Sequence, residues 1–527
     1  VLQQQTPRGT AARVLFAGAM LLTSVAPTGA EFRLPLSRGE QSQPDIAADA
    51  RGGIVVVWRE RFPDSARPLD TIRFQRFSPD GNPAGDSTRV DLLPGDNARN
   101  PSVDMARDGS FVVVWEGGAS EGLNRRTIWA RRFAPNGKPR GRELRIYTKR
   151  LHTSELGVRD WRIGGPGVST APDGSFIVVW QENGAKRGTN SNIILRRVGA
   201  DGEALAPPSR VNHNLELAHF FPAVDHDAKG NFIVVWQQGA QIDTGRELGV
   251  IWGRRFDGNG EPTGEPTLIS SGNGLASAPT LEVAPGGSYA VAWHDRQPKS
   301  RRSTIRIRHA DADGNIGPEI EAGSTSLGAD SQPTIVVTTD KTINVLWSSK
   351  TEDPWVGTIV HSRSFTPGVR QKSTPTNIGP ATCRDRLRPR SVSMPNGDTV
   401  TVWQVDSSFA IEGVRLRPSG RTVPMKSPGP TIAEQVHALL PSEDLFPDAA
   451  DRRQAALDLG CFRFEAASTR SALETVLVND RDPGVRGAAA YALAMVAHDP
   501  GAVLERLLDT TGDESDVARD GAARGLG

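Results

Sequence analysis

A tryptophan recurs at a nearly constant interval through most of this 527-residue chain. The spacings between successive copies are 57, 65, 56, 57, 54 and 56 residues, and each copy ends a run of β-branched and aromatic residues that follows a turn. A self-similar period of this length is typical of folds built from repeated units, and it restricts the chain to such an architecture. The seven copies are Trp58, Trp115, Trp180, Trp236, Trp293, Trp347 and Trp403.

Each unit contains the pattern of four antiparallel strands. In the second unit, a strand begins near Pro101, a turn follows at 108–109, a second strand ends at Trp115, and a third covers 127–133. Proline at a strand start and Asp-Gly in a tight turn are both typical of hairpins. Seven such units predict a mainly β fold, a seven-bladed β-propeller over residues 31–425. An open β-solenoid and a string of small β-sandwiches are the alternatives, although these units are short for a sandwich.

The two ends of the predicted propeller complement each other. The seventh unit has a weak fourth strand near 421–424, and residues 32–36 precede the first unit as a fourth strand would. We therefore expect the N-terminal strand 32–36 to close the last blade, at the cost of one loop closure.

The repeated phrase resembles one found in large bacterial exported proteins. It is complete at Pro172–Trp180, and a third-strand phrase Ile-x-x-Arg-Phe-x-x-x-Gly follows in several units. The resemblance covers residues 32–425 and implies a surface or secreted interaction protein without naming a ligand. Two units depart from it, because Lys341 stands where the turn glycine is expected and Ser391 replaces an apolar core residue.

Residues 1–30 have the pattern of a cleavable secretory signal peptide. Arg8 and Arg13 precede an apolar run over 14–26, and small residues follow at 28–30. Thirteen apolar residues are too few to span a bilayer as a helix, and no later segment reaches that length. A buried N-terminal helix is the alternative. We expect an exported protein, periplasmic, cell-surface or secreted, without a membrane span in the mature chain.

The C-terminal part of the sequence changes to an Ala- and Leu-rich helical pattern. We expect a linker and first helix over 426–447 and a small all-α HEAT-like solenoid over 448–527. Asp482 followed by Pro483 is a helix start, and the same phrase recurs from Asp451 and Asp516. The phrase resembles HEAT repeats, and this resemblance implies a concave face that binds proteins.

Charge is distributed unevenly between these two parts. From Pro430 onward the net charge is −8, whereas the residues before it carry +9. The two parts could attract each other, or the basic part could meet anionic material such as acidic polysaccharide; solvated surfaces without a partner are the simplest interpretation. Cys383 and Cys461 are too few for a disulfide framework, although they could form one bridge in an oxidising compartment.

Motifs of common catalytic chemistry are absent from the sequence. We find no P-loop, dinucleotide glycine motif, Gly-x-Ser-x-Gly, His-Glu-x-x-His or metal-spaced cysteine cluster, and we expect no cofactor and no metal. Imidazoles and carboxylates near the start of the fourth unit could bind a metal or act as acid and base, but solvated loop residues are the favoured interpretation. They are His213, His219, Asp225, His226 and Asp227.

The long loops, which in a propeller share one face, are the predicted binding surface. The longest insertion, 147–165, contains a tryptophan outside the repeat register. The candidate ligand or partner residues on this face are Trp161, Arg159, Trp355, Arg125, Arg126, Arg301 and Arg302. Four arginines around Cys383 (Arg384, Arg386, Arg388 and Arg390) receive no role from the sequence.

These features predict a non-catalytic, secreted or envelope-associated binding or assembly protein and not an enzyme. Its propeller loops and HEAT-like helices would bind protein partners, including a larger surface assembly. The alternative is an extracellular propeller that binds or cleaves a glycan. A glycosidase needs two carboxyl groups roughly 5–10 Å apart, and the sequence shows no pair that breaks the repeat. Export and mixed loop charges argue against nucleic acid as a partner.

Overall fold

The structure is a computed structural model, and it describes the β-rich part of the chain with gaps and one helical hairpin. The described residues are 31–34, 39–62, 69–92, 97–118, 125–150, 163–182, 191–215, 217–241, 247–272, 274–296, 303–326, 332–350, 357–368, 370–378, 385–405, 410–419, 421–423, 425, 456 and 466–496. The predicted signal peptide, the linker 426–447, both cysteines and most of the predicted solenoid lie outside them.

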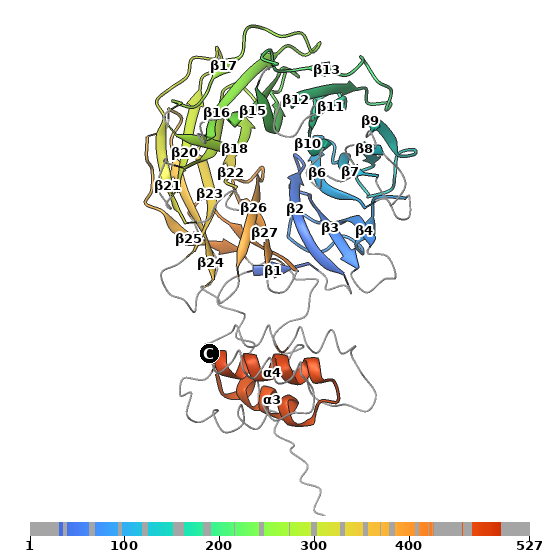
Figure 1. Cartoon of the computed structure of the whole chain (residues 1–527), viewed down its shortest axis with the longest axis vertical. Helices are drawn as coiled ribbons and strands as arrows, with labels where there is room; N and C mark the ends of the chain where they lie inside the picture. The colour runs from blue at the N-terminus through green and yellow to red at the C-terminus, as the bar shows by residue number, and fades with distance from the viewer. Residues whose placement is uncertain are drawn as a thin grey trace, which may run out of the picture.

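The fold is mainly β and of propeller type, with six antiparallel sheets arranged around an axis (Figure 1). The strands follow the sequence repeat. The first strand of each unit is β2 (Glu40–Ala48), β6 (Arg99–Met105), β10 (Ile163–Thr170), β14 (Ala218–His226), β18 (Leu275–Val283), β22 (Thr334–Val337) and β26 (Arg386–Ser393). The second strand is β3 (Ile54–Phe62), β7 (Phe111–Gly117), β11 (Phe176–Glu182), β15 (Phe232–Gln241), β19 (Tyr289–Arg296), β23 (Ile343–Lys350) and β27 (Thr399–Val405).

Two further strands complete each unit on the outside. The third strand is β4 (Leu69–Phe77), β8 (Arg125–Phe133), β12 (Asn192–Val198), β16 (Glu247–Phe256), β20 (Ser303–Ala310), β24 (Thr358–Phe365) and β28 (Ala410–Leu416). The fourth is β5 (Thr88–Arg89), β9 (Leu144–Arg150), β13 (Ser209–Arg210), β17 (Thr267–Leu268), β21 (Ile320–Thr325) and β25 (Thr376–Ile378). In the seventh unit, β1 (Glu31–Arg33) and β29 (Thr422–Val423) both pair with β28.

Units four and five belong to one eight-stranded sheet. A single parallel pair, Gly249 with Leu275, joins β16 to β18. The approach is so close that a side chain at Gly249 would place its Cβ 2.4 Å from the carbonyl oxygen of Ala276. Glycine at 249 therefore permits this contact, and the six sheets correspond to seven four-stranded units.

The core lies between neighbouring units. Each of the seven apolar clusters found in the described residues combines side chains of two consecutive units, and one combines unit seven with unit one. That last cluster includes Phe32 and Leu34 from the N-terminal segment, beside Trp58 and Ile411. The repeated tryptophans are all buried, with at most 2% of their surface exposed. This burial indicates that these side chains pack the units together.

Arginines of the third strand also connect neighbouring units. Arg197 Nη2 donates to the carbonyl oxygen of Gly258 at 2.7 Å, and Arg255 Nη2 donates to that of Ala312 at 2.6 Å. Arg132 binds the carbonyl oxygen of Ala200 in the same way. Each of these arginines thus donates to a carbonyl oxygen in a turn of the next unit, which is a structural role.

The described helical part is a hairpin of α3 (Ala466–Asn479) and α4 (Pro483–Val496). Asp482 caps α4, because its Oδ1 accepts the backbone N–H of Val485 at 3.0 Å. The buried side chains of Leu473, Val476 and Leu493 lie between these elements. Neither described helix is long and apolar enough to cross a membrane.

Candidate functional site

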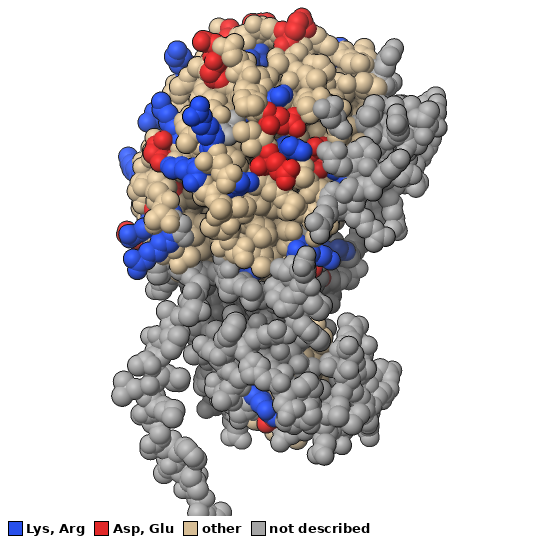
Figure 2. Space-filling model, turned by 90° about the vertical axis from the view of Figure 1, so that its left-hand side faces the viewer, with Lys and Arg blue, Asp and Glu red and all other residues tan. Residues whose placement is uncertain are grey.

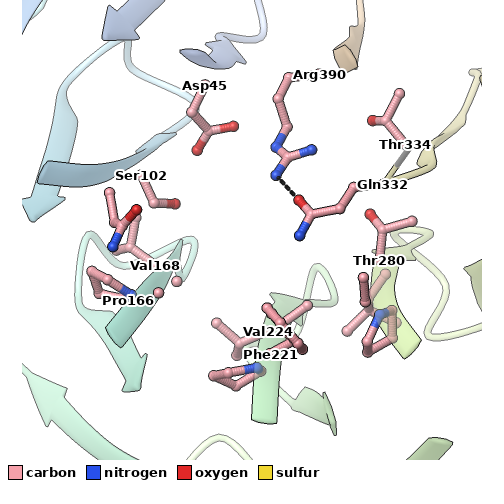
Figure 3. Close-up of a pocket in the computed structure, with 18 of the residues that line it drawn as sticks. Asp45, Ser102, Pro166, Val168, Phe221, Val224, Thr280, Gln332, Thr334 and Arg390 are labelled. Carbon is pink, nitrogen blue, oxygen red and sulfur yellow. Dashed lines mark hydrogen bonds between the residues drawn. The ribbon is translucent and has the colours of Figure 1, made fainter. Parts of the chain in front are cut away.

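The first strands of all seven units enclose a central cavity of about 710 Å³. These strands contact one another in chain order, and β26 contacts β2, so the cavity is surrounded by units one to seven. Its lining is mixed, with polar and charged side chains between prolines and aliphatic residues. Figure 3 shows Asp45, Ser102, Gln332 and Arg390 around this space.

A bulge at the start of the first strand directs these side chains. The residue before the strand-start proline has a positive φ of 50–59° in six units, namely Gln43, Asn100, Gly165, Phe221, Ala278 and Arg388. The pairing with the second strand shifts register at this point, as between Phe220 and Ala223. A bulge bends a strand and re-aims its side chains. The sequence showed the proline but not the left-handed residue that precedes it.

Three carboxylates lie one residue beyond the conserved apolar position of their strands: Asp104, Asp225 and Glu282. Each accepts a hydrogen bond from the backbone of the next unit. Asp104 Oδ2 accepts the N–H of Thr170 at 2.6 Å, and Asp225 Oδ2 accepts that of Val283 at 2.6 Å. The backbone of Val337 hydrogen-bonds Glu282 in the corresponding place. The three acids therefore come from units two, four and five and reach one cavity.

Enclosure of these acids changes their protonation. Burial, and then the charge of Asp225, raises the pKa of Asp104 to about 7. Burial raises the pKa of Asp225 to about 6, against three hydrogen bonds that favour its charged form. The pKa of Glu282 is raised well above its ordinary value by burial and by the charges of Asp225 and Asp104. Near neutral pH the group holds protons that isolated carboxylates would lose, so it can donate as well as accept them.

A hydrogen-bond chain extends from Asp225 away from the cavity. Ser169 Oγ lies 3.2 Å from Asp225 Oδ1, and His226 Nδ1 lies 2.7 Å from Ser169 Oγ. Burial lowers the pKa of His226 to about 4, so its ring is neutral near pH 7. The ring also borders a smaller pocket of about 160 Å³ between units three and four. Ser169 and His226 thus hold Asp225 in place.

The opposite side of the cavity contains an arginine. Arg390 of β26 donates from Nη2 to Gln332 Oε1 at 2.8 Å and from Nη1 to the carbonyl oxygen of Pro389 at 3.1 Å. Asp45 of β2 lies on the neighbouring unit, and its Oδ2 accepts the backbone N–H of Val103 at 3.0 Å. Burial raises the pKa of Asp45, and the charge of Arg390 opposes that change. The cavity is therefore acidic on one side and basic on another.

The loop residues predicted to bind a ligand fall mostly outside the described residues. Arg159, Trp161, Arg301, Arg302 and Trp355 are all in that position. Arg125 begins β8, and the side chain of Arg126 is engaged by a buried carboxylate, with Nη1 2.5 Å from Glu116 Oε1. Their role stays a prediction.

The interpretation of the fourth-unit cluster as solvated loop residues is wrong for most of its members. Asp225 and His226 are enclosed as described above, and His219 is 1% exposed, with Nδ1 2.9 Å from the carbonyl oxygen of Ser191. His213 instead faces Glu265 at 3.1 Å, on the surface. The strand β14 separates these residues, and no metal-holding group of three His, Cys, Asp or Glu occurs among the described residues.

One family model matches part of the C-terminal region. Residues 444–527 match the family of HEAT repeats, in agreement with the resemblance of the phrases that begin at Asp451, Asp482 and Asp516. No curated protein matches the sequence.

Several solved structures are similar to the β-rich part. A protein of unknown function from Dyadobacter fermentans DSM 18053 is 12% identical over 73% of this chain and 97% of that chain, with a TM-score of 0.44. The polysaccharide lyase Uly1 is 8% identical over 73% and 98%, with a TM-score of 0.44. The GH93 alpha-L-arabinofuranosidase of Fusarium graminearum, in complex with arabinobiose, is 9% identical over 74% and 97%, with a TM-score of 0.42.

These findings correct the expectation of a non-catalytic binding or assembly protein that is not an enzyme. The named proteins among the similar structures are glycan-active enzymes rather than assembly subunits. The physical reason for the error lies in the cavity. That expectation rested on the absence of an acid pair that breaks the repeat, whereas Asp104, Asp225 and Glu282 do break it and line one cavity.

Proposed function

We propose that this protein is an exported glycan-active enzyme whose central cavity binds and cleaves a polysaccharide. The observation that carries the proposal is the group of interacting carboxylates, Asp104, Asp225 and Glu282, in a cavity large enough for sugar residues. Glycoside cleavage needs one carboxylic acid that is protonated at the working pH and a second that is charged. Environments that separate the pKa values of neighbouring acids supply this pair.

Asp104 is the proposed general acid. Its pKa of about 7 keeps a proton available near neutral pH, which is the range in which proton transfer to a leaving oxygen is most effective. Asp225, with a pKa of about 6, is the proposed second carboxylate, positioned by Ser169 and His226. Glu282, whose pKa is raised well above its ordinary value by burial and by the charges of Asp225 and Asp104, is proposed to keep its proton beside them.

A closed seven-bladed propeller is the proposed architecture of residues 31–425. Two observations support it: the first strands contact one another in order up to β26 against β2, and β1 pairs with β28 of the last unit. Phe32 fits against Gly413 in that pairing, where a Cβ would lie 2.6 Å from the Phe32 ring. Closure of this kind fixes the cavity geometry, because no unit has a free neighbour.

The remaining parts of the chain have proposed roles around this site. Residues 1–30 are proposed to direct export, on the basis of their charge and apolar pattern. The long loops, with Arg159, Trp161, Arg125, Arg126, Arg301, Arg302 and Trp355, are proposed to extend the cavity rim toward a polymer. Residues 448–527 are proposed to form the HEAT-like solenoid, which the family match and the α3–α4 hairpin support.

The direct test measures cleavage of a panel of polysaccharides by the full chain, by the variants Asp104→Asn and Asp225→Asn, and by one control variant. Asp104→Asn removes the proton donor but keeps an oxygen that can accept the Thr170 N–H, so the fold should persist. We expect activity to fall roughly 10²- to 10⁴-fold, as for loss of a general acid. Asp108→Asn, a change in an exposed turn, is the matched control. Full activity in Asp104→Asn and in Asp225→Asn would remove the basis of the proposal.

A further inference from the structure

Arg390 lines the cavity, and its guanidinium forms no ion pair with a carboxylate among the described residues. Within the described part of the chain, no carboxylate oxygen lies within 4.0 Å of its guanidinium nitrogens. Its two hydrogen bonds go to neutral oxygens of Gln332 and Pro389. A guanidinium has five N–H donors, so three of them have no partner among the described residues. These donors are available to a ligand in the cavity.

Other enclosed arginines of the same unit are paired. Arg415 Nε lies 2.8 Å from Asp398 Oδ2, with both side chains at most 8% exposed. Arg386 lies near Glu412 and over the ring of Trp403. A buried cation without an anion is unfavourable, and burial accordingly lowers the pKa of Arg390. Arg386 and Arg415 of this unit thus lie beside acids, whereas Arg390 has no carboxylate oxygen within 4.0 Å in the described part of the chain.

The carboxyl groups near Arg390 do not form an ion pair with its guanidinium in the described part of the chain. Asp45 is the carboxyl group whose charge acts most on Arg390, but its Oδ2 accepts the Val103 N–H and its pKa is raised. Gln332 presents its amide oxygen to one side of the guanidinium and holds the fork in position, as Figure 3 shows. The remaining edge of the fork faces the cavity and has the geometry that binds two oxygens of one anion.

The position of Arg390 along its strand relates it to the carboxylates. Arg390 lies one residue before the conserved apolar position, whereas Asp104, Asp225 and Glu282 lie one residue after it. Two residues along a strand correspond to about 7 Å. An anion bound to Arg390 would thus sit at a different depth from the acids, separated by a distance comparable with one sugar unit.

We propose that the cavity selects an acidic glycan and that Arg390 binds the anionic group of one of its sugars. This inference rests on the proposed function, and it adds the substrate class. The shared chemistry is an oxyanion on a sugar, which is either the carboxylate of a uronic acid or a sulfate ester. The planar fork of Arg390 fits the two oxygens of a carboxylate, whereas Lys at this place would supply only a point charge.

The test compares binding of three matched probes to the full chain by titration calorimetry. The probes are trigalacturonate, its neutral methyl ester and a sulfated neutral trisaccharide. Arg390→Gln removes the charge, Arg390→Lys keeps it without the fork, and Arg142→Gln, an exposed arginine of unit two, is the control. We expect at least one anionic probe to bind roughly 10- to 100-fold more tightly than the ester, as for a charge-assisted hydrogen bond. Arg390→Gln should abolish that difference, Arg390→Lys should reduce it, and Arg142→Gln should keep it.

The two anionic probes separate the two sources of charge, since preference for trigalacturonate identifies a uronate and preference for the sulfated probe identifies a sulfate ester. Equal affinity for the ester and both anionic probes would overturn the inference, as would an Arg390→Gln variant that matches Arg142→Gln. If Arg390→Gln fails to fold, Arg390→Lys alone decides, because it must weaken the anionic probe and leave the ester unchanged.

The proposed function is tested separately. Cleavage of a neutral glycan that depends on Asp104 but not on Arg390 would preserve the function and reject the substrate class. Binding of an anionic probe through Arg390, with no cleavage of any glycan, would do the reverse.

Discussion

The second strands of the units have nearly the same sequence in every copy, whereas the sequences of the first strands differ from unit to unit. The second strands repeat nearly the same residues, and every copy ends in a tryptophan that is at most 2% exposed. The first strands repeat only the proline and the apolar residue. The position after the apolar residue is Ala47, Asp104, Ser169, Asp225, Glu282, Val336 and Val392 in the seven units. The residues that repeat pack the units together, whereas the three acids at the varying position line the cavity.

This contrast teaches where to look for chemistry in such a chain. A residue present in every unit satisfies a contact that every unit makes. A titratable residue present in one or a few units, at a position that faces the axis, has no such explanation. Surface charge gives no comparable indication, because acidic and basic side chains are interspersed on the face shown in Figure 2.

The strongest test of the packing side is truncation of a repeated tryptophan. Trp180→Ala should lower the free energy of unfolding by about 3–5 kcal/mol, because a fully buried indole leaves a cavity between units two and three. Chemical denaturation monitored by circular dichroism measures it. Leu205→Ala, at a side chain that is 52% exposed, is the control and should change stability little. A loss below 1 kcal/mol at Trp180 would contradict the assignment of these residues to packing.

In the cavity, removal of an acid should raise stability while it lowers the proposed activity. The pKa of Asp104 is raised from 3.8 to about 7 in the folded state. Its protonated form therefore stabilises the fold below pH 4, and this contribution is lost as the pH rises from 4 to 7. Asp104→Asn should be more stable than the wild type at pH 8, by roughly 4 kcal/mol, and equally stable near pH 4.

Denaturation at several pH values measures this difference. Asp311→Asn is a matched control, because the pKa of Asp311 is lowered by hydrogen bonds from Asn315 and no gain at pH 8 is expected. A variant Asp104→Asn whose stability has the same pH dependence as the wild type would show that folding does not raise the pKa of Asp104.

A smaller effect should follow from crowding the contact of the N-terminal strand. Gly413→Ala would place a Cβ 2.6 Å from the Phe32 ring and 2.7 Å from the carbonyl oxygen of Thr401. We expect a loss of about 2 kcal/mol in unfolding free energy, in the range of overpacking. Gly286→Ala, where no atom lies within 4 Å of the added Cβ, is the control. Equal midpoints for the two variants in thermal denaturation would argue that β1 does not hold units seven and one together.

The smallest effect concerns the turn that lacks glycine. Lys341 has φ +64°, a conformation that strains residues other than glycine. The carboxylate of Asp340 stabilises the turn by accepting hydrogen bonds from Thr338 and Thr342. Lys341→Gly should stabilise the protein by about 1 kcal/mol. Lys350→Gly, at the end of β23, should not stabilise it. A destabilised Lys341→Gly variant would mean that the amine contributes more than the backbone strain removes.

Much of this fold could be predicted from the sequence because the period is local. Each Asp-Gly turn, each Phe-Val-Val-Trp strand and the pairing of Phe32 with the last unit follow from patterns within a few residues. The bulge before the proline could not be predicted, since Gln43, Phe221 and Arg388 share no side-chain chemistry and only the backbone requires their positive φ.

The candidate site was missed for a different reason. The acids Asp104 and Glu282 are 178 residues apart, and only the ring brings them together. An alignment of the seven units would have marked the position after the apolar residue as the one that varies in charge. His226 was found but given the wrong environment, because its burial depends on unit three, which contributes Ser169.

The hydrogen bonds from the cavity carboxylates to the next unit link acidity to mechanics. Asp104 and Asp225 each accept a backbone hydrogen bond from a neighbouring first strand. The carboxyl group that accepts this bond is also the group that is protonated or deprotonated. A charged carboxylate accepts a stronger hydrogen bond than a protonated one. The hydrogen bond between two adjacent units therefore weakens when its carboxylate binds a proton and strengthens when the proton leaves. The contact between adjacent first strands thus depends on the protonation state of the acids that line the cavity.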